Sequence, residues 1–294
     1  MSASRRLWPD ARVRVALGVA LGVVAYVFLL WTLRHSSYSA SPLLGAYMDM
    51  AGSLIAFTFA ANAMVRFRGT RDRISLILGF GFVLAGLIEA ATSLASYRGM
   101  LIPRLTGDQI SLGWFAGRTL LGVLLLAALV VEKRIPVARE PGKEIAGATL
   151  IVGAAAYLIS VFYFLLPHAP SIQPDAWVPR PWDLFPAAIF AVATVGYGLR
   201  LRRADAWLDR TLFLSAALNF LCHVTISQSQ QSLDACDMAA RGLMVLSYVA
   251  VLGGTLLDNA KLFDQVSLLA SSDPLTGLAN HRQMLEVIEG EIQR

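Results

Sequence analysis

Long apolar runs separated by short charged loops constrain the fold of this chain more than any other feature. Apolar residues make up 56% of the sequence and charged residues 15%, against about 25% charged in ordinary soluble domains. A helix that spans a bilayer needs about 20 mostly apolar residues. Eight segments qualify, of which the seventh is the least apolar: 13–33, 44–66, 74–96, 112–131, 145–167, 182–201, 208–228 and 239–259. Because lipid cannot satisfy the unpaired backbone groups of an open sheet, the sequence predicts an all-α polytopic membrane bundle.

Basic residues concentrate in every second loop. They precede the first span and follow the second, fourth and sixth: Arg5, Arg6, Arg12, Arg14; Arg66, Arg68, Arg71, Arg73; Lys133, Arg134, Arg139, Lys143; Arg200, Arg202, Arg203, Arg210. The positive-inside rule then predicts that both termini are cytoplasmic. The net charge of +5 reflects this topology and the anionic lipid headgroups. No basic stripe with interleaved aromatic residues indicates a nucleic-acid partner.

Four ionisable residues lie inside predicted spans: Asp49, Glu89, Arg118 and His223. A helical rise of about 1.5 Å per residue places each of them roughly 8–10 Å below the outer surface, in one layer. Polar residues accompany them at helical spacing, namely Ser53, Ser93, Ser215 and Asn219. Charged side chains inside a bilayer are costly and usually face the bundle interior or a water-filled cavity. The sequence therefore predicts that the layer converges inside the bundle.

Two interpretations of this layer stay open on the sequence. In the first, the planar guanidinium of Arg118 donates two hydrogen bonds to an anionic ligand in a pocket that opens outward. Alternatively, Arg118 neutralises Asp49 and Glu89 and holds the second to fourth spans together, because structural ion pairs have the same sequence pattern. A metal or haem site would draw on His35, His168 and His223. No histidine pair at i, i+4 spacing supports a coordination geometry, so we expect no metal and no haem here.

The two cysteines do not form a metal-binding pair. Cys222 lies within the seventh predicted span, and Cys236 lies in the loop that follows it. An oxidising outer face leaves a disulfide conceivable. A small thiol inside a helix and an unrelated loop cysteine are the simpler interpretation.

The apolar stripe of the last span continues beyond the bilayer. Leu252, Leu256, Asn259, Phe263, Val266 and Ala270 follow a 4-3-4-3-4 spacing. This is the seam of a coiled coil, in which one polar residue such as Asn259 fixes the register. The pattern predicts a membrane domain over 1–259 and a signalling helix over 260–272 that joins two copies as a parallel homodimer. Alternatively, the same stripe packs against its own bundle or lies on the membrane surface.

Residues 47–131 resemble the third type of membrane-associated sensor (MASE) domain. The resemblance is carried by a carboxylate early in one span, by the basic loop after that span, by a motif at the end of the next span, and by Trp114 and Arg118 in the span after it; the motif is Tyr97, Arg98, Gly99 and Met100. The family usually has an aspartate and a histidine near the end of the span before the motif, and here Glu89 stands nearby. The histidine usual in this family near Glu89 is absent, and Thr92 and Ser93 occupy that region. The family precedes GGDEF cyclases or histidine kinases, so the resemblance implies a sensory role for an unknown signal.

A second resemblance selects between these outputs. Seven residues match the opening signature of GGDEF domains, with His281 in place of a usual arginine: Asp273, Leu275, Thr276, Gly277, Leu278, Asn280 and Arg282. The resemblance implies that 273–294 begin an α/β diguanylate cyclase domain, which converts two GTP to cyclic di-GMP with Mg²⁺ in a bacterial inner membrane protein. The catalytic GGDEF loop lies outside these 294 residues, so we expect no catalytic residue and no cofactor within them. The simpler interpretation of the signature is an Asp-Pro turn before a short helix.

The leading hypothesis is therefore a membrane sensory module that controls a diguanylate cyclase. A transporter is the first alternative, although such proteins typically have broken helices near the middle of the membrane, and this polar layer is shallow. A helical anchor that dimerises a cytoplasmic domain is the second, and it requires no ligand site.

Overall fold

Helices account for nearly all of the described chain. A computed structural model describes residues 11–101, 107–135, 137–165, 172–201, 207–271, 288–289 and 291–292, with only the backbone at several helix ends, including 95–101 and 265–271. The helices are α1 (Ala11–Arg34), α2 (Pro42–Thr70), α3 (Arg73–Leu101), α4 (Gly107–Arg134), α5 (Pro141–Leu165), the short η1 (Pro181–Asp183), α6 (Leu184–Leu201), α7 (Trp207–Ser227) and α8 (Ala235–Ser271). Within the described ranges there is no strand, only two isolated bridges. The all-α prediction is confirmed.

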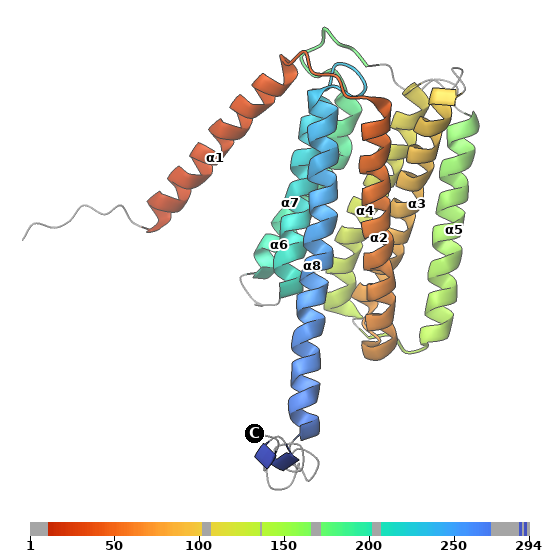
Figure 1. Ribbon diagram of the computed structural model, residues 1–294, viewed down its shortest axis with the longest axis vertical. Helices are drawn as coiled ribbons and strands as arrows, with labels where there is room; N and C mark the ends of the chain where they lie inside the picture. Colours follow the sequence, from red (N-terminus) through yellow and green to blue (C-terminus); the bar gives the residue numbers. More distant parts are fainter. Residues whose placement is uncertain are drawn as a thin grey trace, which may run out of the picture.

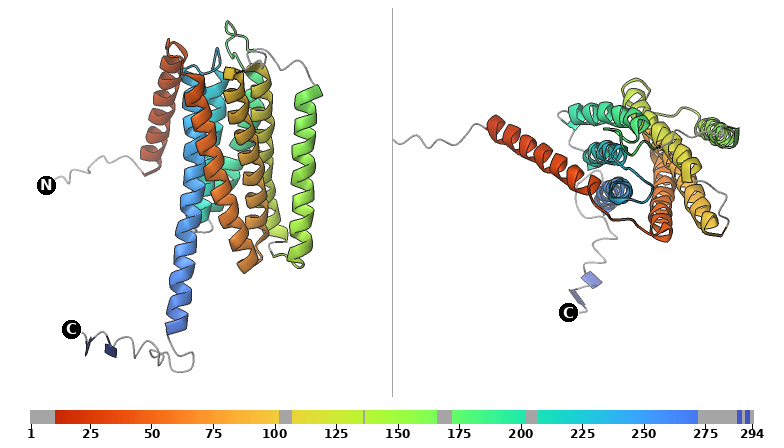
Figure 2. Two further views of the ribbon diagram at one scale, coloured as in Figure 1. Left: turned by 45° about the vertical axis from the view of Figure 1, so that its right-hand side comes forward. Right: turned by 90° about the horizontal axis from the view of Figure 1, so that it is seen from above.

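Six of the helices close into a ring. Each helix contacts the next one in the order α2, α3, α4, α6, α7 and α8, and α8 packs against α2. The view along the helices shows this ring, with α5 outside it against α3 and α4 (Figure 2). α1 slants away from the bundle, and the lower part of α8 extends beyond it (Figure 1).

Eight long helices occupy the eight predicted spans. Six of them are long and apolar enough to cross a bilayer in the part of the chain that is described: α1, α2, α3, α4, α6 with η1, and α8. α5 and α7 are not among these six, so membrane crossing by 145–167 and 208–228 stays a prediction. α7 nevertheless lies between α6 and α8 in the ring, which aligns it with two helices that qualify.

Small residues bring α2 and α3 close together. Ala56, Ala60 and Ala63 are buried on one face of α2, and a Cβ added to Gly79 on α3 would lie 3.3 Å from that of Ala63. Close approach through small residues is the usual packing mode of membrane helices, because lipid leaves little hydrophobic drive between them. The tight α2–α3 pair sets the distance at which polar residues on the two helices meet.

The peripheral helix α5 is held at its start by an ion pair. Glu144 accepts from Nε and Nη2 of Arg73 at 2.7 and 2.5 Å, which is bidentate geometry. The hydrogen-bonded guanidinium lowers the pKa of the Glu144 carboxyl. Arg73 therefore links α3 to α5, although the sequence placed it only among the basic residues of a cytoplasmic loop.

The first helix touches the bundle at few points. Its side chains from Leu17 to Arg34 are mostly exposed. The Tyr26 hydroxyl donates to the Leu221 carbonyl at 2.9 Å, and Arg34 donates to the Trp177 carbonyl and to Gln228. These contacts attach α1 through one end of α7 and the 172–180 segment, and leave the rest of its apolar surface for lipid.

α8 is the longest helix and continues the predicted last span through Ser271. Asp234 caps its start, since Oδ1 accepts from the Asp237 backbone N–H at 2.8 Å. Leu256 and Phe263 in the predicted seam are 53% and 74% exposed. The side chains of Val266 and Ala270, and the whole signature from Asp273 to Arg282, lie outside the described residues. The α/β domain predicted to start at 273 is therefore not shown, and pairing of the seam stays a prediction.

Two adjacent glycines on α8 give a matched pair of substitutions. A Cβ at Gly254 would lie 2.1 Å from Thr211 Oγ1 on α7, whereas a Cβ at Gly253 would meet nothing within 4 Å. We expect Gly254→Ala to destabilise the bundle by about 1–3 kcal/mol through overpacking. Gly253→Ala should be neutral or stabilising by up to ~1 kcal/mol, because alanine is the better helix former. Thermal unfolding in detergent measures both, and equal midpoints would contradict close α7–α8 contact at this position.

Candidate functional site

The core of the polar layer is a chain of three side chains. Tyr248 on α8 donates its hydroxyl to Glu89 Oε1 at 2.6 Å and accepts from Arg118 Nη1 at 2.8 Å. Glu89 and Arg118 are each 2% exposed, and Tyr248 is fully buried. The positive charge of Arg118 therefore reaches Glu89 through a tyrosine hydroxyl. This chain joins α3, α8 and α4.

Aromatic rings enclose the Arg118 guanidinium. Its central carbon lies 5.3 Å from the Trp114 ring centroid and 5.2 Å from that of Tyr248. Cation–π contacts of this kind strengthen when they are shielded from water. Arg118 makes no direct ion pair in the described structure. The two rings and the Tyr248 hydroxyl thus lie against the guanidinium.

Asp49 has a different partner from the one that the sequence suggested. Arg241 on α8 donates from Nη1 to Asp49 Oδ1 and from Nε to Asp237 Oδ1, the latter at 3.2 Å. Asp49 is fully buried, and Asp237 is 2% exposed. Sequence reasoning missed Arg241, because it falls at the edge of the last predicted span. The i, i+4 spacing of Asp237 and Arg241, one turn inside an apolar segment, was the signal that could have found it.

His223 lies next to Trp114 and to the Asp183 carboxylate. Its Nδ1 is 3.5 Å from Asp183 Oδ1, and its ring is 5.2 Å from Trp114 and stacks on Phe190 at 5.6 Å. His223 is fully buried on α7, whereas Asp183 belongs to η1. The predicted layer therefore continues from Arg118 to His223 through an indole ring.

Asn219 and the serines tie the helices around this layer. Asn219 Nδ2 donates to the Ser247 hydroxyl on α8 at 3.0 Å. Ser53 donates to the Gly86 carbonyl, and Ser93 donates to the Ala46 carbonyl, each at 2.9 Å. These bonds cross the α7–α8 and α2–α3 contacts, whereas Ser215 accepts from Asn219 Nδ2 within α7.

Both cysteines are buried and unpaired. Cys222 donates to the Ala240 carbonyl at 3.1 Å. The disulfide alternative is therefore wrong, and Cys222 acts as a small hydrogen-bonding residue between α7 and α8.

Several buried polar atoms of the layer have no hydrogen-bond partner in the described structure. They are Asp49 Oδ2, Glu89 Oε2, Trp114 Nε1, Arg118 Nε and Nη2, and both ring nitrogens of His223. Most buried polar groups in proteins are paired. The layer therefore contains buried donors and acceptors that other described residues do not satisfy.

The remaining predicted residues lie elsewhere. His35 follows α1, where it is exposed and contacts the Trp31 ring and carbonyl. His168 and the side chains of Tyr97, Arg98, Gly99 and Met100 lie outside the described residues. Among the residues that are described, no three His, Cys, Asp or Glu side chains form a group that could hold a metal ion.

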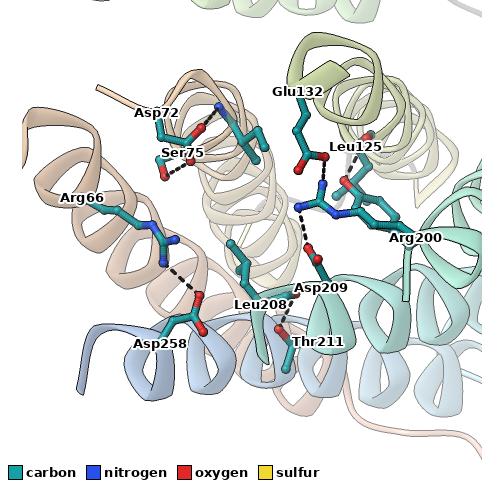
Figure 3. A network of polar contacts seen from close by, with 12 residues as sticks. Arg66, Asp72, Ser75, Leu125, Glu132, Arg200, Leu208, Asp209, Thr211 and Asp258 are labelled. Atoms are coloured by element: carbon teal, nitrogen blue, oxygen red, sulfur yellow. Dashed lines mark hydrogen bonds and ion pairs between the residues drawn. The ribbon is translucent and has the colours of Figure 1, made fainter. Parts of the chain in front are cut away.

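A second polar cluster occupies the opposite end of the bundle. Arg200 on α6 pairs with Glu132 on α4 and with buried Asp209 on α7, the latter at 2.7 Å (Figure 3). Arg66 on α2 pairs with Asp258 on α8 at 3.2 Å in the same view. The sequence assigned these arginines only to basic loops. In the structure they join neighbouring helices of the ring.

Comparison with known proteins gives one result. A family model for MASE3, a membrane-associated sensor domain, matches residues 36–259. The match begins after α1 and ends at Asn259 within α8, so it includes every residue of the polar layer. Neither a curated protein nor a solved structure matches this chain.

Proposed function

Because the chain belongs to the MASE3 family of membrane-associated sensor domains, we propose that its buried polar layer receives a signal and that α8 transmits it to a cyclic di-GMP output. The observation that carries this proposal is the position of Asp237, Arg241 and Tyr248. All three lie on α8, and each contacts the layer, directly or through Arg241. The same helix continues beyond the bundle to Ser271. A change in the layer therefore acts on the one helix that leads out of it.

The proposed signal is a ligand that competes for charged groups of the layer whose hydrogen bonds are incomplete. Arg118 keeps the Nε–Nη2 edge of its guanidinium unpaired, and Glu89 keeps one oxygen unpaired. A ligand that binds either group draws it away from the Tyr248 hydroxyl, which is hydrogen-bonded to both. Asp49 is already paired with Arg241 and serves as the second connection to α8. This arrangement favours a signal-receiving role over that of a passive anchor, because an anchor does not need a buried polar layer.

The proposed output is diguanylate cyclase activity in the intact protein. The support is the Asp273–Arg282 resemblance to the start of GGDEF domains. In that reaction the 3′-hydroxyl of each GTP attacks the α-phosphate of the other, and two diphosphates leave. Two cyclase domains must therefore meet, and the seam through Leu256 and Phe263 supports a parallel homodimer.

The first test concerns the gene and its product. We expect the reading frame beyond Arg294 to encode a Gly-Gly-Asp/Glu-Glu-Phe loop. In cells that carry the intact protein, Tyr248→Phe should change the level of cyclic di-GMP, because it removes the link between Arg118 and Glu89. Tyr197→Phe is the matched control, since this buried tyrosine donates to the Leu125 carbonyl away from the layer. A frame without the loop, or the same level in both variants, would contradict the proposal.

The orientation of the bundle is tested separately. We propose that both termini are cytoplasmic, which is supported by the basic N-terminal segment and by the three basic loops after the second, fourth and sixth spans. In a background with Cys222→Ser and Cys236→Ser, Thr70→Cys should resist an impermeant thiol reagent applied from outside. Gln173→Cys should react with it. Labelling at position 70 in sealed cells would show that the orientation is reversed.

A further inference from the structure

Two contacts with α2 hold α8 near the point where it leaves the bundle. Asn259 Nδ2 donates to Asn62 Oδ1 at 2.7 Å, and Arg66 Nη1 donates to Asp258 Oδ2 at 3.2 Å. Asn62 and Arg66 lie one turn apart on α2, and their partners are adjacent on α8. We call these four residues the inner clasp. The Arg66–Asp258 pair is visible where α8 crosses α2 in Figure 3.

The clasp lies at the point where α8 leaves the bundle. The next described contact is that of Lys261 Nζ, 5.3 Å from the Trp207 ring centroid on α7. Leu262, Phe263 and Asp264 after it are exposed. The inner clasp is thus among the last contacts that α8 makes with the ring before the signalling helix.

One clasp residue is also the polar member of the predicted seam. Asn259 lies between Leu256 and Phe263 in the 4-3-4-3 spacing. A polar residue at such a position pairs with its counterpart in a second helix and fixes the register. In this structure the same amide faces Asn62 of its own chain. The two arrangements compete for one side chain.

We propose that the inner clasp is an autoinhibitory contact, which holds Asn259 on α2 and away from a second copy of the chain until α8 moves. This inference rests on the proposed function, because it describes how the dimer seam is controlled. The polar layer is placed to release the clasp. Tyr248 and Asp258 are ten residues apart on one continuous helix, a distance of about 15 Å. A shift of α8 at Tyr248 is therefore delivered to the clasp.

The first experiment traps the clasp in the full 294-residue protein in membrane vesicles. The background carries Cys222→Ser and Cys236→Ser. We expect Asn62→Cys with Asn259→Cys to form an intramolecular disulfide on mild oxidation. Asn62→Cys with Lys261→Cys is the matched control and should form much less, because Lys261 contacts α7 instead. Equal disulfide formation in the two pairs would overturn the clasp.

The second experiment opens the clasp and measures crosslinking between copies at Phe263→Cys. Arg66→Ala should raise the crosslinking rate about tenfold, the factor that corresponds to loss of about 1.4 kcal/mol. Arg68→Ala is the matched control, since this exposed arginine lies on the same turn of α2. The exchanged pair Arg66→Asp with Asp258→Arg should restore the slow rate.

The outcomes separate the clasp from the function on which it rests. Failure of the exchanged pair to restore the slow rate, or equal rates in the Arg66 and Arg68 variants, would overturn the clasp while leaving the dimer intact. A disulfide between positions 62 and 259 with no crosslinking at position 263 in any variant would overturn the proposed dimer, and with it the inhibitory role of the clasp.

Discussion

Replacement of Arg241 by alanine is expected to destabilise the bundle by about 3–5 kcal/mol. Arg241 is the described ion-pair partner of both Asp49 and Asp237. Its loss leaves two buried carboxylates without a positive charge, and an unpaired buried charge is far more costly than a lost surface pair. Unfolding by a denaturing detergent, followed in micelles, measures the change in free energy.

Two further variants identify the cause of this loss. Arg68→Ala removes an exposed arginine near the inner end of α2 and should cost about 0–1 kcal/mol. Asp49→Asn in the Arg241→Ala background should recover part of the stability, because it removes one of the two stranded charges. The stability changes caused by substitutions at neighbouring residues of one network are not additive, so the double variant measures the coupling between Asp49 and Arg241 directly. If Asp49→Asn adds its own full cost instead, the pair does not interact as the geometry indicates.

Arg118→Ala is expected to have an effect of similar size, about 3–5 kcal/mol. The substitution removes the donor to Tyr248 and the only described positive charge that reaches Glu89 through a hydrogen-bonded path. It also empties the space between the Trp114 and Tyr248 rings, which the guanidinium now fills. Arg118→Lys should lose much of the same stability, because an ammonium group lacks the planar shape that stacks between two rings.

The partner residue again provides the decisive comparison. Glu89→Gln should stabilise the Arg118→Ala protein, although it should weaken the protein that retains Arg118. Opposite signs in the two backgrounds are the signature of a charge compensated through Tyr248. The same sign in both would show that Arg118 contributes mainly by packing.

Much of the fold was predictable because hydrophobic length and period are local properties. Each of the eight long helices overlaps a segment predicted from an apolar run, since about 20 apolar residues without a breaker leave few alternatives in a bilayer. Asp49, Glu89, Arg118 and His223 are buried inside the bundle, as their positions within apolar spans predicted, and their depth in a bilayer stays a prediction. Residues 47–131 also carried the family resemblance, and the matched region proved to be longer.

The partners within the layer were not predictable in the same way. Tyr248 is one aromatic residue in an apolar stripe, and nothing in its neighbourhood in the sequence distinguishes a bridging hydroxyl from an ordinary core ring. Arg241 sits at the edge of a span, where positive charge is unremarkable. Periodicity tells which residues share a face of a helix, but the rotation of that face about its neighbours depends on packing across the whole ring.

The sequence by itself determined the all-helical class of this protein and the approximate positions of its helices, because both depend on composition and spacing along one segment. Only the tertiary structure decided that Arg241 pairs with Asp49, that Tyr248 joins Glu89 to Arg118, and that Asn259 contacts Asn62. These contacts join residues 130 to 197 positions apart along the chain. Such pairs form only where the ring closes α8 onto α2, α3 and α4, and no local pattern in the chain encodes that closure.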